Sequence, residues 1–205
     1  MELACLDLEG VLVPEVWIAV AQTTGIAELR LTTRDISDYD ELMEHRLRVL
    51  DQHGLKLPDI QAVIATLRPL DGAPEFVDWL RERYQVIILS DTFYQFADPL
   101  MAQLGRPTLF CHHLLVADDG TITGYRLRMA DQKRHSIIAF QSLNFACIAA
   151  GDSYNDTSML GQAEQGILFN PPQRVVDEFP QFPVTRNYDE LRTEFTRASQ
   201  RLANN

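Results

Sequence analysis

Short apolar segments that alternate with helical patterns constrain the fold of this chain more than any other feature. Five such segments lie at residues 3–8, 86–89, 108–111, 146–150 and 166–169, and each is followed by a polar residue or glycine. Continuous apolar runs of this length are typical of strands that are buried on both faces, as in a parallel sheet. Because helical periodicity fills the intervals, we predict an α/β fold with a doubly wound, mainly parallel, five-stranded core sheet of the Rossmann type.

The connection between the first two apolar segments is too long for a single crossover helix. Apolar residues at helical spacing divide it into three segments, roughly residues 14–24, 38–53 and 58–67. We therefore interpret residues 14–70 as an inserted helical cap, and residues 1–13 and 71–205 as the catalytic α/β core. Residues 113–128 alternate weakly around Asp118-Asp119-Gly120, which predicts a small β-hairpin.

The charge and apolar content of the chain limit its partners. It has 18 Lys and Arg residues against 29 Asp and Glu residues, a formal net charge of −11, so we expect neither nucleic acid nor an anionic membrane as a partner. The longest apolar run, residues 16–21, falls far short of the ~20 residues of a membrane span. Three widely spaced cysteines fit a reducing compartment. We therefore expect a cytoplasmic protein, and a homodimer is left open.

Polar side chains follow three of the predicted strands at their carboxyl ends, where open α/β sheets bind ligands. They are Asp7 and Glu9 after the first strand, Ser90, Asp91 and Thr92 after the second, and Asp152, Asn155 and Asp156 after the fourth. Lys133 opens the helix that precedes the fourth strand. The sheet therefore gathers carboxylates, a hydroxyl and an ammonium group along one edge.

This combination of groups predicts phosphoryl transfer. Asp7 and Asp152 can hold Mg²⁺, a hard cation that binds oxygen ligands and keeps several of its waters. Asp7 can then act as the nucleophile and form an aspartyl phosphate, while Ser90 and Lys133 bind the phosphoryl oxygens. Glu9 can protonate the leaving oxygen and later activate water, a contribution of ~10²–10⁴-fold in rate.

These residues resemble the four ordered motifs of the haloacid dehalogenase superfamily. The resemblance rests on Asp7-Leu8-Glu9-Gly10-Val11-Leu12, Ser90, Lys133 and Gly151-Asp152 with Asp156. Within the superfamily the chain is most similar to the phosphoserine phosphatases, and especially to bacterial proteins that also transfer the phosphate of phosphoserine to homoserine. The resemblance implies that phosphoserine and homoserine are substrates. It also implies that the Glu9 backbone carbonyl is a Mg²⁺ ligand and that Asp156 supports Lys133 or the metal indirectly.

The same resemblance implies which residues bind the substrate. Glu15, Tyr39 and Arg46 match the cap residues of the family by position, and Asn155 matches the Asn of its fourth motif. Tyr39 and Arg46 also fall on one face of the predicted 38–53 helix. Glu15 suits an ammonium group, and Arg46 suits bidentate contact with a carboxylate.

The chain departs from the common family pattern at two places. Glu9 stands where the usual first motif has Asp, and its extra methylene changes how the acid–base group approaches the phosphate. Asp91 and Thr92 replace a Gly pair beside the substrate. The bifunctional relatives share both departures, which therefore favour transfer to an alcohol over hydrolysis alone.

Three other functions are compatible with parts of the pattern. A response-regulator receiver also carries Asp, a hydroxyl and Lys on a parallel sheet, but its phosphorylated Asp follows a later strand and its first strand precedes no cap. A binding protein without catalytic activity would lack the nucleophile, a metal ligand or the phosphate cation, and all of them are present. A phosphatase of another metabolite, such as a sugar phosphate, fits the Glu15 and Arg46 pair less well than a zwitterion does.

Each site residue also has a purely structural interpretation. The acids, the serine and the lysine can each be a solvated loop residue, a helix cap or a surface charge, but four matches in order favour function. In the cap, Arg46 can instead form an internal ion pair, Glu15 can complement a helix dipole, and Tyr39 can be a hydrophobic wall. The pair His112-His113 lacks a third metal ligand, and we expect both histidines on the surface.

Overall fold

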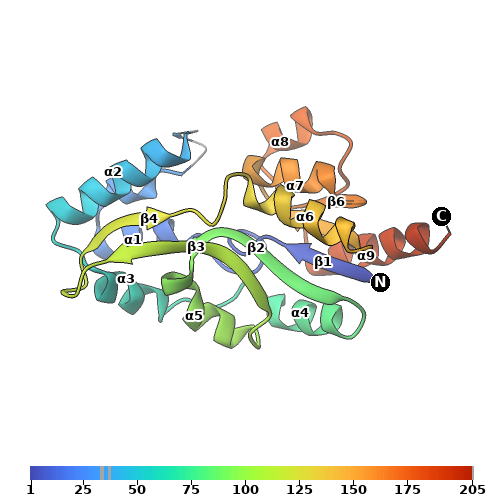
Figure 1. Ribbon diagram of the computed structural model, residues 1–205, viewed down its shortest axis with the longest axis horizontal. Coiled ribbons are helices and arrows are strands. Elements are labelled where there is room, and N and C mark those ends of the chain that lie inside the picture. The colour runs from blue at the N-terminus through green and yellow to red at the C-terminus, as the bar shows by residue number, and fades with distance from the viewer. Residues whose placement is uncertain (33–34, 37, 205) are drawn as a thin grey trace.

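The computed structural model describes residues 1–32, 35–36 and 38–204, and its centre is a twisted sheet (Figure 1). Within these residues the sheet has seven strands in the order β4-β3-β2-β1-β5-β6-β7, and the β3–β4 pair alone is antiparallel. The strands are β1 (Glu2–Leu6), β2 (Gln85–Phe93), β3 (Thr108–Val116), β4 (Ile122–Arg126), β5 (Ala146–Gly151), β6 (Gln165–Phe169) and β7 (Val184–Thr185). The predicted α/β class is confirmed. The predicted count of five strands is wrong, because the hairpin strand β4 and the two-residue β7 join the same sheet.

Helices cover both faces of the sheet (Figure 1). One face packs against α4 (Ala73–Arg81), α5 (Tyr94–Gln103) and α9 (Tyr188–Ala203), and the other against α6 (Gln132–Ser142), α7 (Thr157–Gln162) and α8 (Gln173–Glu178). The side chains of β1 alternate between the faces, so that Ala4 and Leu6 join the first apolar cluster, and Leu3 and Cys5 join the second. Burial on both faces explains why this strand is a continuous apolar run in the sequence. None of the helices in the described residues combines the length and apolar character of a membrane span.

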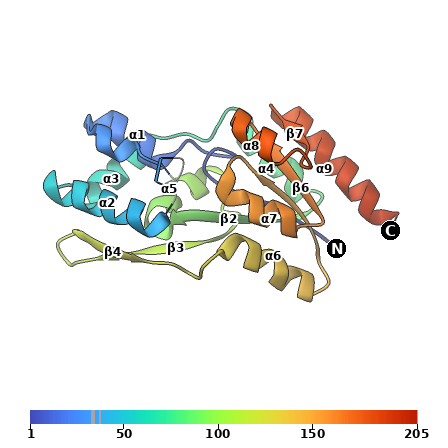
Figure 2. The ribbon, with the colours of Figure 1, turned by 90° about the horizontal axis from the view of Figure 1, so that it is seen from above.

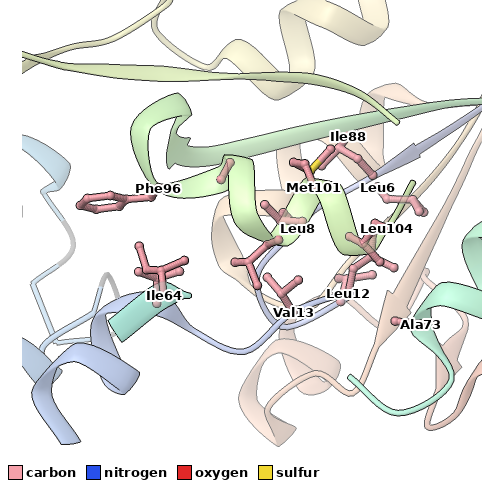
Figure 3. Close-up of a cluster of buried hydrophobic side chains, with 14 of the residues drawn as sticks. Leu6, Leu8, Leu12, Val13, Ile64, Ala73, Ile88, Phe96, Met101 and Leu104 are labelled. Atoms are coloured by element: carbon pink, nitrogen blue, oxygen red, sulfur yellow. The ribbon is translucent and has the colours of Figure 1, made fainter. Parts of the chain in front are cut away.

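Four helical segments lie between β1 and α4, at one end of the molecule (Figure 2). They are α1 (Val16–Thr24), the 3₁₀ helix η1 (Ala27–Arg30), α2 (Tyr39–Gln52) and α3 (Leu57–Ile64). The three α-helices overlap the three predicted helical segments, whereas η1 is too short to show a period in the sequence. Ile64 of α3 belongs to the same buried cluster as Leu8, Val13 and Phe96 (Figure 3), so the inserted helices share the core of the sheet.

The hairpin formed by β3 and β4 extends from the sheet along α2 (Figures 1 and 2). Its turn contains Gly120 at φ +85°, a left-handed conformation that glycine adopts without a steric penalty. The Lys56 ammonium lies 2.7 Å from the Asp119 carboxylate, and the Leu57 N–H donates to the Gly120 carbonyl at 2.9 Å. The predicted hairpin is therefore present, and its tip is tied to the segment that precedes α3.

Strand β2 is longer than the apolar run that predicts it. Its pairing with β3 shifts register between Leu89 and Phe93, which marks a bulge, and resumes with Phe93 opposite His112. Ser90, Asp91 and Thr92 therefore lie inside the bulged strand, whereas the sequence predicts that they follow the strand. The bulge therefore directs the side chains of these residues toward the sheet edge that carries the candidate site.

Candidate active site

Asp7 and Asp152 follow β1 and β5, which are parallel neighbours in the sheet. The backbone N–H of Asp7 donates to the Ala150 carbonyl at 3.0 Å, so the loop after β1 continues the pairing with β5. Gly10 at φ +78° brings this loop onto Asp152, and a Cβ atom there would lie 2.6 Å from the Asp152 carboxylate carbon. The Asp-Leu-Glu-Gly sequence therefore needs its glycine for this close approach.

Lys133, in the first turn of α6, is the buried cation beside Asp7. Its Nζ lies 2.7 Å from Asp156 Oδ1, 3.0 Å from Asp7 Oδ1 and 3.4 Å from Asp91 Oδ2. Burial raises the pKa of Asp7 well above its usual range, the negative charge of Asp156 adds to this, and Lys133 opposes it. Burial lowers the pKa of Lys133, but the negative charges of Asp156 and Asp7 raise it by more. The Lys133 pKa therefore lies well above its usual range.

Asp156 is fully buried and binds groups of the protein with both oxygens. One oxygen accepts from Lys133 at 2.7 Å, and the other accepts from the backbone N–H groups of Asp152 at 2.9 Å and Ser153 at 3.1 Å. Gly151 makes room for it, because a Cβ atom there would lie 2.4 Å from the Asp156 side chain. Asp156 therefore fixes both the lysine and the loop that carries Asp152.

The acids at this edge fit a hard divalent cation. Asp7, Asp152 and Asp156 each offer a carboxylate oxygen, and these oxygens lie within 4.8 Å of one another. Oxygen-only ligands suit Mg²⁺, which keeps waters in its remaining positions. Both oxygens of Asp156 bind Lys133 and backbone N–H groups, which fits the indirect role expected of Asp156, and Asp7 and Asp152 could hold the cation directly.

Glu9 faces the same cavity as Asp7. Its Oε2 accepts a hydrogen bond from the Val16 N–H at 2.8 Å, at the start of α1. Burial and the nearby charge of Glu15 raise the pKa of Glu9 to about 7, against the opposing hydrogen bonds from Val16 and Thr92. A carboxyl group with this pKa can both give and take a proton near neutral pH.

Arg46 is a buried cation on α2, with 7% of its surface exposed. Its guanidinium lies over the Trp17 ring, 4.6 Å from the ring centre, and donates to the Leu31 carbonyl at 3.0 Å. No carboxylate of the described residues forms a salt bridge with Arg46, and its buried Nε has no hydrogen-bond partner among them. Burial lowers the pKa of Arg46 to about 10, which still leaves it charged at neutral pH. The ion pair that the sequence allows is therefore not formed with any described residue.

Glu15 and Tyr39 line the same cavity from the ends of two helices. Glu15 is the residue before α1, and its side chain accepts no capping hydrogen bond from that helix. The Tyr39 hydroxyl donates to the Asp91 backbone carbonyl at 3.0 Å, which ties α2 to strand β2. Burial and the charge of Asp91 raise the pKa of Tyr39 above its usual range, so the hydroxyl keeps its proton.

The bulged segment of β2 places Ser90 and Thr92 at the site. Ser90 is buried, its Oγ accepts from the Thr92 N–H at 3.3 Å, and its carbonyl accepts from Gln132 Nε2 at 3.0 Å. Asp91 has donors on both oxygens, because Asn155 Nδ2 lies 2.9 Å from Oδ2 and His112 Nε2 lies 3.5 Å from Oδ1. Burial opposes ionisation of Asp91, but Lys133, His112 and Asn155 hold its pKa well below the usual range.

One cavity brings most of the predicted residues together. Ten of the twelve predicted site residues line it: Asp7, Glu9, Glu15, Tyr39, Arg46, Ser90, Asp91, Thr92, Asp152 and Asn155. The other two, Lys133 and Asp156, lie next to Asp7 and contact it or each other. A wider neighbouring cavity of about 760 Å³ shares Tyr39, Asp91 and Asn155 with the first and is lined by Lys133.

Sequence reasoning missed three residues around this site. Trp17 lines the cavity beneath Arg46, and Gln132 donates to the Ser90 carbonyl. The expectation that His112 lies on the surface is wrong, because only 3% of it is exposed and it faces Asp91. His113, its neighbour, is exposed as expected. The only sequence signal for Gln132 is that it directly precedes Lys133. The orientation of His112 depends on how β3 pairs with the bulged strand β2, which the sequence does not reveal.

Known proteins resemble this chain along nearly its whole length. A phosphoserine phosphatase of Pseudomonas syringae pv. tomato is 65% identical over 201 residues, which cover 98% of this chain and 85% of the relative. The phosphoserine phosphatase ThrH of Pseudomonas aeruginosa is also 65% identical over 201 residues, with 98% of each chain covered. A solved phospho-aspartyl intermediate analogue of phosphoserine phosphatase superposes with a TM-score of 0.77 at 21% identity, over 94% of this chain and 98% of that one. The sequence profile of haloacid dehalogenase-like hydrolases matches residues 1–164, and the chain belongs to this hydrolase family.

Proposed function

We propose that this hydrolase is a Mg²⁺-dependent phosphoserine phosphatase that acts through an aspartyl phosphate on Asp7 and can also transfer the phosphoryl group to homoserine. The observation that carries the proposal is the cavity that holds both the acidic edge around Asp7 and the buried cation Arg46, which forms no salt bridge with a carboxylate of the described residues. Phosphoserine has one group for each end of this cavity, a phosphate and a carboxylate. The two Pseudomonas relatives are named phosphoserine phosphatases, which supports phosphoserine as the substrate.

The first step is attack by the Asp7 carboxylate on phosphorus. Mg²⁺ bound by Asp7, Asp152 and the Glu9 backbone carbonyl would neutralise phosphate charge and so allow an anionic nucleophile to approach. Ser90 and Lys133 bind the phosphoryl oxygens, and protonated Glu9 gives its proton to the departing seryl oxygen. Serine leaves, and the phosphoryl group remains on Asp7.

The second step returns Asp7 to its free form. Glu9, now ionised, takes a proton from an incoming hydroxyl, whose oxygen attacks the aspartyl phosphate. Water as the incoming group releases inorganic phosphate, and the homoserine hydroxyl yields phosphohomoserine. The Glu9 pKa of about 7 suits both halves of this cycle, because neither protonation state is rare near neutral pH.

The amino-acid end of the substrate lies against the inserted helices in this proposal. Arg46 binds the carboxylate in a bidentate manner, Glu15 binds the ammonium group and Tyr39 forms one wall. Asp91, Thr92 and Asn155 border the phosphoryl site. Residues 14–70 then serve as a cap over a core made of residues 1–13 and 71–205.

Homoserine as an acceptor is supported by the shape of its molecule and by the chain's own residues. Homoserine is serine with one extra methylene, so the same Arg46 and Glu15 pair can hold it with its hydroxyl directed at Asp7. Serine must leave before homoserine takes its place, which predicts ping-pong kinetics through one shared site. Free thiols at Cys5, Cys111 and Cys147 fit a reducing compartment, and we place the reaction in the cytoplasm.

Product analysis by phosphorus NMR tests this function. Phosphoserine and Mg²⁺ alone are expected to give inorganic phosphate, and a rising homoserine concentration is expected to add phosphohomoserine. Inorganic phosphate at every homoserine concentration would reduce the protein to a phosphatase. No turnover of phosphoserine in either assay would refute the proposal as a whole.

A further inference from the structure

His112 is a buried histidine that the proposed reaction does not use. It lies on β3 opposite Phe93, and its ring packs near the Tyr39 ring with 6.1 Å between the ring centres. The backbone N–H of Arg128 donates to its Nδ1 at 3.1 Å. A nitrogen that accepts a hydrogen bond carries no proton, so the proton of the neutral ring lies on Nε2.

That Nε2–H faces the Asp91 carboxylate. Nε2 lies 3.5 Å from Asp91 Oδ1, a polar contact that is longer than the ~2.7–3.2 Å of an ordinary N–H···O hydrogen bond. Gln132 Nε2 lies 3.4 Å from the same oxygen, and Asn155 Nδ2 lies 2.9 Å from Oδ2. One short hydrogen bond from Asn155 and two longer contacts from Gln132 and His112, on three different elements, therefore orient Asp91.

The orientation of Asp91 matters because this carboxylate competes for Lys133. The Lys133 ammonium lies 2.7 Å from Asp156, 3.0 Å from Asp7 and 3.4 Å from Asp91, so Asp91 is the most distant of its three acidic neighbours. An ammonium group has only three protons to donate. If Asp91 turned fully onto Lys133, it would occupy the donor that a phosphoryl oxygen needs.

We propose that His112 is a positioning residue, whose Nε2–H holds the Asp91 carboxylate back from Lys133 and so keeps that ammonium available for the phosphoryl group. The inference rests on the proposed phosphoryl transfer at Asp7, but it adds a residue outside the substrate-binding set. It also gives a role to the departure from glycine at position 91. An acid there is tolerated beside an anionic substrate only while other donors restrain it.

The first test needs no catalytic activity. In the free enzyme, long-range proton–nitrogen NMR of the histidine rings is expected to show a neutral Nε2–H tautomer for His112, assigned by the loss of its signals in His112→Gln. An Nδ1–H tautomer for this ring would overturn the proposal, because Nε2 would then have no proton to give to Asp91.

The second test measures the KM for phosphoserine and for p-nitrophenyl phosphate, a substrate that needs no amino-acid contacts. His112→Leu is expected to raise both KM values about tenfold with a smaller change in kcat, as expected for the loss of a polar contact to a charged group. His113→Leu is the matched control, since this exposed neighbour on β3 should leave both values unchanged. His112→Gln keeps a donor near the Nε2 position and should stay within about threefold of the wild type.

A double-mutant cycle separates positioning from simple packing. In an Asp91→Asn background, where the competing charge is gone, His112→Leu should have no further effect on either KM. Equal effects of His112→Leu with and without Asp91→Asn, or equal effects of the Leu and Gln variants, would overturn the proposal. Thermal unfolding shows whether His112→Leu folds. If it does not, the KM values of His112→Gln and the tautomer measurement decide between the outcomes. If the enzyme hydrolyses p-nitrophenyl phosphate but not phosphoserine, the proposed substrate is wrong. The KM for p-nitrophenyl phosphate then still tests whether His112 keeps Lys133 available.

Discussion

Replacing Arg46 by alanine is the sharpest test of how the cavity recognises its substrate. Arg46 is already desolvated, with 7% of its surface exposed, and it forms no salt bridge with a described carboxylate. A substrate carboxylate therefore gains a charge-assisted hydrogen bond without displacing an internal acid. Hydrogen bonds to charged groups contribute about 1.5–3 kcal/mol, so Arg46→Ala is expected to lower kcat/KM for phosphoserine by about 10- to 150-fold, chiefly through KM.

The matched substrate for this test is phosphoethanolamine, which is phosphoserine without the carboxylate. Its kcat/KM should change by less than about threefold in Arg46→Ala, because the lost contact never existed for it. Arg46→Lys keeps the charge but not the planar fork, and we expect a partial loss with phosphoserine. Arg48→Ala is the control variant, since Arg48 lies two residues along the same helix and is exposed.

Equal losses with both substrates would refute the assigned role. Arg46 also lies over the Trp17 ring and donates to the Leu31 carbonyl, so it can contribute to packing of the inserted helices. A purely structural residue would lower activity toward every phosphate ester and lower the Tm in parallel. Only a loss confined to substrates with a carboxylate supports binding.

The other residues of the site give four further predictions. Asp7→Asn keeps the shape of the nucleophile but not its charge, so activity should fall to background with an unchanged Tm, and normal turnover would exclude the covalent mechanism. Exhaustive chelation with EDTA should abolish activity and added Mg²⁺ should restore it; full activity after chelation would contradict a metal at Asp7 and Asp152. Because Glu9 must be protonated in the first step and its pKa is about 7, kcat/KM should fall as pH rises above that value, and Glu9→Gln should remove this inflection. Glu15→Gln should raise the KM for phosphoserine about tenfold. The KM for 3-phosphoglycerate, which has no ammonium group, should not change.

The sequence predicts the parts of the site that depend on single strand ends. Asp7 and Asp152 each follow an apolar run, and parallel neighbours bring such ends together whatever the details of packing. Helical spacing also places Arg46 on the face that carries Tyr39, whereas its expected part in substrate binding came from the resemblance to the phosphoserine phosphatases. The placement of these three residues needs only local periodicity and the general geometry of parallel sheets.

The features that the sequence does not predict depend on register or on very short elements. The bulge in β2 decides that Asp91 meets His112, and no local pattern distinguishes His112 from the exposed His113. The helices α7 and α8 have six residues each and β7 has two, too few for a period to be recognised. Contacts between residues that are far apart in the sequence, such as the ion pair between Lys56 and Asp119 at the hairpin tip, appear only in the folded molecule.

The charge balance of the site explains why its parts must act together. The phosphoryl site is surrounded by the carboxyl groups of Asp7, Glu9, Asp91, Asp152 and Asp156. Lys133 cannot offset an added phosphate dianion alone, because Asp156 and Asp7 already share its charge at 2.7 and 3.0 Å. Tight binding of the phosphate in the proposed reaction therefore calls for a divalent cation, and linkage requires that the phosphate strengthen cation binding by the same factor. In the proposed function Arg46 binds the substrate carboxylate, so different cations in one cavity would offset the two negative ends of phosphoserine.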